Sequence, residues 1–436
     1  MKELIETNSS APQSWIMQAF IHGDCNGFND CQHANWYFAP WHRSYLYYFE
    51  KLIQHFSENP NFALPYWDWS STISVPSQFY GDGNPLDDNI SIQSNCPDAP
   101  PAGRGVPEGA RFNYAQLNAY VGAGRVEEIQ SNPDYKSYLG SGSKEPGAGE
   151  LEETPHNFVH RWVGGEDSGK SSNMVQTFSP LDPIFWMHHC NVDRLYSDWL
   201  GRDGHNYPND SEWTEKSFNN FYDADGNQVG GNFTCGDTVN STVMGYIYDT
   251  DKLSNLSRLL PLRTLPSKPQ VIDSVVASKS SIKENLLTFE TDTPLRRRPR
   301  SLLGATAVGA PNYVVRLRIE GVKIPKRQDT GVFIFLGSGI TPETPISAPG
   351  FVDNFTFFEG GSGSDSKSQD HKHKKNVILN ATKAVKRLYG NADLPEDTTL
   401  PVSIVTRSLF GDRDASATVE EIQPDRIKIE IVDLNG

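Results

Sequence analysis

Six histidines in two groups of three constrain the fold of this chain more than any other feature. Neutral imidazole is a good ligand for copper, zinc, iron and nickel, and three such ligands leave a position on the ion open. The spacings suit two adjacent ions, so the fold must bring distant segments of the chain together. The first group is His22, His33 and His42, and the second group is His156, His160 and His189.

The first group comes from three local elements. His42 lies at the start of a stretch, residues 41–58, whose apolar periodicity predicts a helix. His33 precedes Pro40 and therefore reaches the site from a different element, because proline interrupts a continuous helix. His22 ends the separate apolar stretch W-I-M-Q-A-F-I-H. Three ligands from three elements would form a rigid cage.

The second group includes a pair on one helical face and one histidine in an apolar setting. His156 and His160 are four residues apart, so a helix places both rings on one side. His189 lies near the start of a predicted helix, in F-W-M-H-H. Buried polar groups need partners, which a metal ion or the protein core could provide. Asp193, one turn later, could orient a ligand ring or pair with Arg194.

The length and pattern of the chain predict two domains. A chain of 436 residues is too long to fold around one small hydrophobic core. Residues 1–265 hold the six histidines, helical periodicity and long loops, which predicts a mainly α catalytic domain. Residues 266–311 carry prolines, a Ser/Lys stretch and a basic run, which predicts a linker. Residues 312–436 alternate apolar and polar positions, which predicts a β-sandwich around the low-complexity insert G-G-S-G-S-D-S-K-S-Q-D-H-K-H-K-K.

Charge and composition exclude several partner classes. The formal charge of −15 disfavours nucleic acid and anionic membranes. No run approaches the roughly 18 apolar residues of a membrane span, and M-K-E-L-I-E-T-N-S-S lacks the apolar region of a secretory signal. Five cysteines do not indicate a disulfide scaffold. We expect a soluble chain whose compartment and oligomeric state stay open.

Two long motifs resemble the copper motifs of the type-3 copper family, which comprises tyrosinases, catechol oxidases and hemocyanins. They are H-A-N-W-Y-F-A-P-W-H-R, with Ala39 in place of a larger residue, and D-P-I-F-W-M-H-H-C-N-V-D-R. The resemblance makes His189, not His188, the ligand, and implies two copper ions in a four-helix bundle. N-F-A-L-P-Y-W-D-W and the Y-x-Y at Tyr246 and Tyr248 are similar to plant-type polyphenol oxidases and their bacterial relatives.

The resemblance implies a copper-dependent oxidation of o-diphenols to o-quinones with O₂, together with the hydroxylation of monophenols. An O₂ carrier of hemocyanin type and an o-aminophenol oxidase are the alternatives. A dizinc hydrolase fits less well, because such sites normally include carboxylate ligands. The C-terminal strands resemble a domain that shields the active site in latent forms, so we expect cleavage near Arg296–Arg300 to raise activity.

Family members also imply roles for residues around the histidines. Glu152, or Glu153 beside it, would hold a water next to copper with the help of Asn157, unless the two glutamates form a solvated loop pair. Cys31 would form a thioether with His33, and Cys25 is the rival for that bond; two reduced thiols, or a disulfide between them, remain possible. The expected substrate mouth comprises Arg161, Gln176, which replaces a phenylalanine of many plant catechol oxidases, and Phe178.

Overall fold

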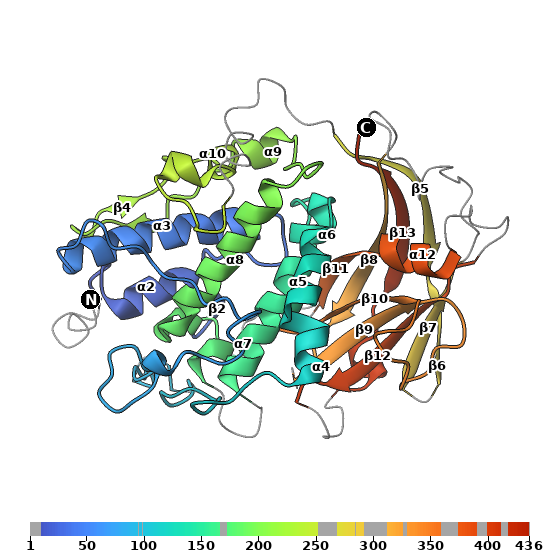
Figure 1. Ribbon diagram of the computed structural model, residues 1–436, viewed down its shortest axis with the longest axis horizontal. Helices are drawn as coiled ribbons and strands as arrows, with labels where there is room; N and C mark the ends of the chain where they lie inside the picture. The colour runs from blue at the N-terminus through green and yellow to red at the C-terminus, as the bar shows by residue number, and fades with distance from the viewer. Residues whose placement is uncertain are drawn as a thin grey trace.

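The structure is a computed structural model. It describes residues 10–251 except 95, 98 and 166–171, residues 268–291 except 284, and residues 312–325, 329–358, 374–389, 399–410 and 417–435. Figure 1 shows two parts side by side, which we call the helical part (residues 10–251) and the β part (residues 268–435). Within the described residues, no helix is both long and apolar enough to cross a membrane.

The helical part is built around two long helices that cross near its centre (Figure 1). The ring of Phe49 on one stacks on Trp186 of the other, with centroids 3.3 Å apart. The helix predicted from residue 41 begins three residues earlier, at Phe38. The α-helices described here are α2 (Trp15–His22), α3 (Phe38–Phe56), α4 (Tyr114–Gln116), α5 (Ala123–Gln130), α6 (Tyr135–Leu139), α7 (Asn157–Gly164), α8 (Ile184–Leu200), α9 (Ser211–Thr214) and α10 (Cys235–Thr238).

Short turns and hairpins connect these helices. A π-helical segment, η3 (Glu152–His156), leads directly into α7. The other short helical turns are η1 (Ser77–Phe79), η2 (Leu117–Val121), η4 (Asn173–Val175), η5 (Ser179–Leu181) and η6 (Ser241–Met244), and the two-residue strands are β1 (Gly23–Asp24), β2 (Gly27–Phe28), β3 (Phe221–Tyr222) and β4 (Gln228–Val229).

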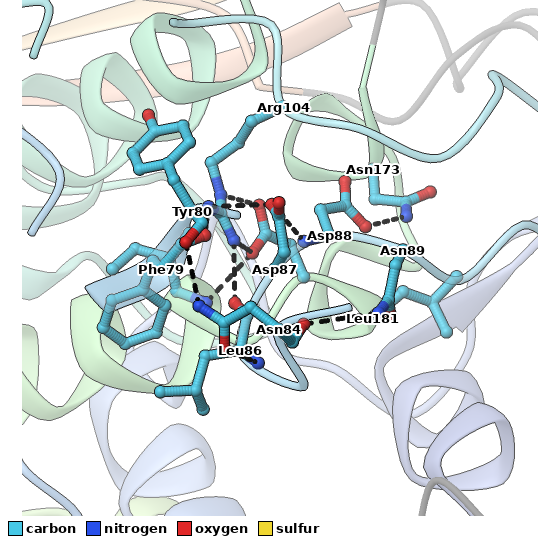
Figure 2. Close-up of polar contacts among 12 residues, drawn as sticks. Phe79, Tyr80, Asn84, Leu86, Asp87, Asp88, Asn89, Arg104, Asn173 and Leu181 are labelled. Atoms are coloured by element: carbon cyan, nitrogen blue, oxygen red, sulfur yellow. Dashed lines mark hydrogen bonds and ion pairs between the residues drawn. The ribbon is translucent and has the colours of Figure 1, made fainter. Parts of the chain in front are cut away.

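Arg104 joins the loop of residues 80–87 to the segment just before α8 (Figure 2). The buried side chain of Arg104 pairs with Asp182 at 2.6 Å and donates to the carbonyl groups of Leu86 and Phe79. Asp182 in turn accepts from the backbone N–H of Ile184 at 3.1 Å, in the first turn of α8. The arginine therefore fixes the loop to the helix that carries His189.

The β part consists of two antiparallel sheets that share one apolar core. The strand orders are β10-β9-β12-β7-β6 and β11-β8-β13-β5. Its elements are β5 (Gln270–Ala277), β6 (Lys279–Lys283), β7 (Leu286–Glu290), β8 (Tyr313–Lys323), β9 (Thr330–Leu336), β10 (Phe351–Phe355), β11 (Lys374–Asn380), α12 (Thr382–Tyr389), β12 (Val402–Ser408), α13 (Val419–Ile422) and β13 (Arg426–Asp433).

The predicted linker, residues 266–311, is wrong in its first half. Residues 270–290 form β5, β6 and β7, and Ala277 and Leu287 are fully buried in the core of the β part. The error has a physical origin, because the exposed strand K-S-S-I-K has none of the alternation that marks a half-buried strand. Arg296–Arg300 and residues 360–373 of the low-complexity insert lie outside the described residues, whereas its last two residues, Lys374 and Lys375, begin β11.

Buried polar contacts join the two parts. Arg316 of β8 pairs with Asp134 at 2.8 Å, and Arg125 of α5 pairs with Asp353 of β10. The backbone at Ala148 forms a parallel bridge with β11. Separating the parts would remove Asp134 from Arg316 and Asp353 from Arg125, so that each arginine would keep only the carboxylate of its own part, Glu430 or Glu128. The β part is therefore docked closely on the segment that leads into η3.

Candidate metal centre

Two groups of potential ligands lie together in the interior of the helical part. Within each group the ligand atoms all lie within 4.8 Å of one another. The six histidines predicted from the sequence are all included, together with one cysteine and one further histidine. The groups are His22, Cys31, His33 and His42, and His156, His160, His188 and His189.

Backbone carbonyl groups orient the first group. His22, the last residue of α2, donates from Nδ1 to the carbonyl of Thr177, and His42 on α3 donates from Nδ1 to Phe38 at 2.8 Å. Each bond fixes the ring tautomer and leaves Nε2 with a lone pair. The Nε2 atoms of His22 and His33 are buried and have no hydrogen-bond partner among the described residues. A metal ion would satisfy them.

Two rings of the second group are oriented through Nδ1, one by a side-chain amide oxygen and one by a backbone carbonyl. His156, at the end of η3, donates from Nδ1 to Oδ1 of Asn157 at 2.9 Å, and His160 on α7 donates to the carbonyl of Met174 at 2.8 Å. Nε2 of His160 lies 3.3 Å from Nε2 of His189. A cation shared by both rings would stabilise this approach of two nitrogen atoms.

His188 and His189 differ in their partners. His188 accepts from the indole N–H of Trp69 through Nδ1 at 3.1 Å. The ring of His189 stacks on His42 from the first group, with centroids 4.3 Å apart and planes 12° apart. His189 therefore lies between the two groups. The assignment of His189 as the ligand stays a prediction, since both rings are close to His156.

Burial keeps these imidazoles neutral. Desolvation lowers the pKa of His22 to about 4 and that of His156 to about 3, and it places the pKa of the other histidines of both groups well below the ordinary value. The neutral ring is the form that coordinates metal ions. The centre is thus in a ligating state at neutral pH.

The sequence suggested that Asp193 orients a ligand ring or pairs with Arg194. Among the described residues Asp193 makes neither contact. Its carboxylate accepts from Arg43 at 2.5 Å and from the hydroxyl groups of Tyr246 and Tyr248 at 2.6 and 2.7 Å. Arg43 follows His42 on α3, so the buried pair ties α3 to α8. In the sequence, this role of Asp193 is indicated only by the position of Arg43 directly after the ligand candidate His42.

Glu152 and Glu153 are both buried, so the solvated loop pair is wrong. The Glu152 carboxylate accepts from the backbone N–H of Ala34, next to the first group, at 2.8 and 3.1 Å. Burial raises the pKa of the Cys31 thiol, and the charge of Glu152 raises it further. Glu153 points the other way and pairs with Lys375 of the β part at 2.6 Å.

The cysteines differ from the sequence prediction in one respect. Cys25 forms a disulfide with Cys96, 71 residues later, which removes it as a rival for a thioether. The sequence could not show this pair, because only the fold brings the hairpin of β1 and β2 beside the long loop. The buried Cys31 keeps a free thiol, whose Sγ lies 3.3 Å from Nδ1 of His33 and 3.4 Å from Nε2 of His42.

Phe358, which the sequence analysis did not single out, covers the centre. It follows β10 in the β part, and its ring stacks on His160 with centroids 4.0 Å apart and planes 23° apart. It also lies 6.0 Å from the ring of His33 and 6.1 Å from that of Phe28. Only 4% of Phe358 is exposed. In this conformation an aromatic side chain occupies the space above both histidine groups.

The expected mouth residues lie around the covered centre. Arg161 and Phe178 are buried, and Gln176 is half-buried. Gln176 and Phe178 flank Thr177, whose carbonyl orients His22. A role for these three residues in substrate contact therefore depends on removal of the cover.

The chain matches the family model of the common central domain of tyrosinase over residues 12–202. It is 28% identical over 367 residues to a tyrosinase from Hahella sp. (strain CCB-MM4), across 74% of each chain. It is 27% identical over 402 residues to a chloroplastic polyphenol oxidase from Malus domestica, across 84% of this chain and 65% of that protein. The matched region therefore spans slightly less than two thirds of the plant relative.

Two solved structures share the fold of nearly the whole chain. A recombinantly expressed latent aurone synthase (polyphenol oxidase) has a TM-score of 0.66 and 22% identity, covering 99% of this chain and 85% of that chain. Latent apple tyrosinase has a TM-score of 0.62 and 19% identity, covering 99% and 92%. At these identities the likeness concerns the fold, a helical domain followed by a C-terminal domain.

Proposed function

This chain belongs to the type-3 copper family of tyrosinases and polyphenol oxidases, and we propose that it oxidises o-diphenols to o-quinones with O₂ and also hydroxylates monophenols. It is an oxidoreductase with a dicopper cofactor. The observation that carries the proposal is the pair of buried histidine groups, whose oriented rings leave Nε2 atoms without protein partners among the described residues.

The donor set fits copper. Neutral imidazole suits copper, and among the described residues neither group includes a carboxylate. We assign one ion to His22, His33 and His42 and the other to His156, His160 and His189, held in a frame of α2, α3, α7 and α8. When bound, the two ions supply the redox chemistry that couples O₂ to the phenol.

The surrounding residues position the substrate and its proton. Glu152 is the acceptor that, through a water, would take the proton of a phenol, and Asn157 fixes the ring of His156 beside it. Arg161, Gln176 and Phe178 would form the mouth. The apolar surroundings exclude bulk water and so protect the reactive quinone product from side reactions.

A substrate assay tests the proposed function. We expect the chain, once its cover is displaced, to consume O₂ with catechol, to release a coloured quinone and to act on tyramine and tyrosine. If the chain does not act on tyrosine and turns over o-aminophenol faster than catechol, the result would favour an o-aminophenol oxidase. A reversible near-ultraviolet band under O₂ with no quinone from any substrate would instead indicate an oxygen carrier.

We also propose the thioether between Cys31 and the ring of His33. Sγ of the free Cys31 lies 3.3 Å from Nδ1 of that ring, and Cys25 is bound to Cys96. Copper-loaded protein that has been fully reduced and unfolded should then be lighter by about two hydrogens than the sequence mass, as a covalent C–S bond resists reduction whereas a disulfide does not. A chain of full mass in which Cys31 reacts with iodoacetamide would show that no such bond forms.

A further inference from the structure

We propose that Glu153 is a positioning residue for His156, which acts through Asn157 and selects the ring tautomer that can bind copper. This inference rests on the proposed ligand role of His156. It assigns Glu153 a task different from that of Glu152, because the two carboxylates face opposite directions. Glu152 accepts from the backbone N–H of Ala34, which follows His33 of the first group, whereas Glu153 contacts Asn157 and the β part.

Three side chains form a continuous relay. Oε1 of Glu153 accepts from Nδ2 of Asn157 at 3.3 Å, and Oδ1 of Asn157 accepts from Nδ1 of His156 at 2.9 Å. All three residues are at most 2% exposed. The proton on Nδ1 leaves Nε2 of His156 with its lone pair, and this atom has no hydrogen-bond partner in the described part of the chain. The relay thus holds the ring in its ligating form.

The glutamate decides which way the asparagine amide faces. An amide has a donor end and an acceptor end, and rotation by a half-turn exchanges them. A carboxylate only accepts, so Glu153 requires the NH₂ end, and the carbonyl of Thr356 lies at 3.5 Å from the same nitrogen. The oxygen of Asn157 must then face His156. A neutral amide in place of Glu153 could present its own NH₂ and allow the reversed orientation, which favours a proton on Nε2 and blocks coordination.

Lys375 of β11 provides the counterion. Its Nζ lies 2.6 Å from Oε2 of Glu153 and donates to the carbonyl of Thr356 at 2.9 Å. The Thr356 backbone N–H also donates to the carbonyl of Glu153 at 3.2 Å. These contacts allow a carboxylate to stay charged in a buried place. The docked β part therefore supports the same relay that ends at the histidine ring.

The test compares the two ends of the ion pair in the full chain. Glu153→Gln should shift the copper-free His156 ring toward the Nε2–H tautomer, which ¹⁵N chemical shifts report once the signal is assigned with His156→Gln. It should also weaken copper retention at one site by roughly 10- to 100-fold in a chelator competition. Lys375→Met removes the positively charged partner of the same ion pair. Measured at mildly alkaline pH, this variant should keep the Nδ1–H tautomer of His156 and the copper affinity.

The double variant Glu153→Gln/Lys375→Met leaves no lone buried charge, so it keeps the test decisive if the single glutamine variant fails to fold. It should show the tautomer and copper affinity of Glu153→Gln. Equal copper loss in Lys375→Met and in the glutamine variants would overturn the proposal, since the pair would then act only by joining the two parts. An unchanged Nδ1–H tautomer in the glutamine variants would overturn it too. Failure of the unaltered chain to bind copper would refute the proposed function instead, while the tautomer of the copper-free ring would still test the relay.

Discussion

His42→Ala will abolish O₂ binding and lower catechol oxidation by roughly a thousandfold or more. The substitution removes one of three ring nitrogens from a buried group, and a metal ion contributes several kcal/mol to such a reaction, at about 1.4 kcal/mol per factor of ten. Copper content and the rate of quinone formation measure the loss. His42 also donates to the Phe38 carbonyl and stacks on His189, so the change affects both groups.

The matched control is His55→Ala, on the same helix but exposed in its last turn. Surface substitutions usually change stability by less than about 0.5 kcal/mol, so this variant should be nearly silent. A second comparison separates the adjacent histidines of α8. His189→Ala should lose copper, and His188→Ala should retain it. Copper loss from His188→Ala alone would contradict the ligand assignment.

Phe358→Ala is expected to raise the activity of the full chain by roughly thirtyfold. In the closed form, the conformation in which Phe358 covers the centre, this ring lies on His160, where a phenol would have to bind. Removing the buried ring costs the closed form about 2 kcal/mol, which corresponds to a factor of about thirty in its population relative to open forms. The measurement is the initial rate of quinone formation from catechol, with copper content verified for each protein.

Phe355→Ala controls for general loosening of the β part. Phe355 is fully buried in the core between the two sheets, and within the described part of the chain its ring contacts Phe357 and the ammonium group of Lys375 rather than a histidine of the centre. This variant should lower the melting temperature at least as much as Phe358→Ala, with a smaller gain in rate. A folded, copper-loaded Phe358→Ala protein that is no faster than the parent chain would show that this ring does not limit access. Cleavage near Arg296–Arg300 remains a separate prediction.

Local sequence patterns were sufficient for the residues whose role depends on nearby spacing. The six histidines could be found because each lies in a dense apolar motif or one helical turn from another, and the structure brings all six together. The alternation after residue 312 likewise predicted strands that the structure contains.

Contacts between distant segments could not be predicted in this way. Asp193 meets Arg43 because α3 packs on α8, and Phe358 reaches His160 because the β part docks on α7. Neither pair has a local signature. Glu153 was identified only as an alternative to Glu152, since the partner that distinguishes it, Lys375, is 222 residues away.

The central claim is that two copper ions are held by six imidazoles in the helical part. The most direct test is elemental analysis of the folded, copper-reconstituted full chain after exhaustive removal of loosely bound metal. The account predicts two copper ions per chain, and fewer in His42→Ala under the same treatment. One copper ion or none in the unaltered chain would contradict it.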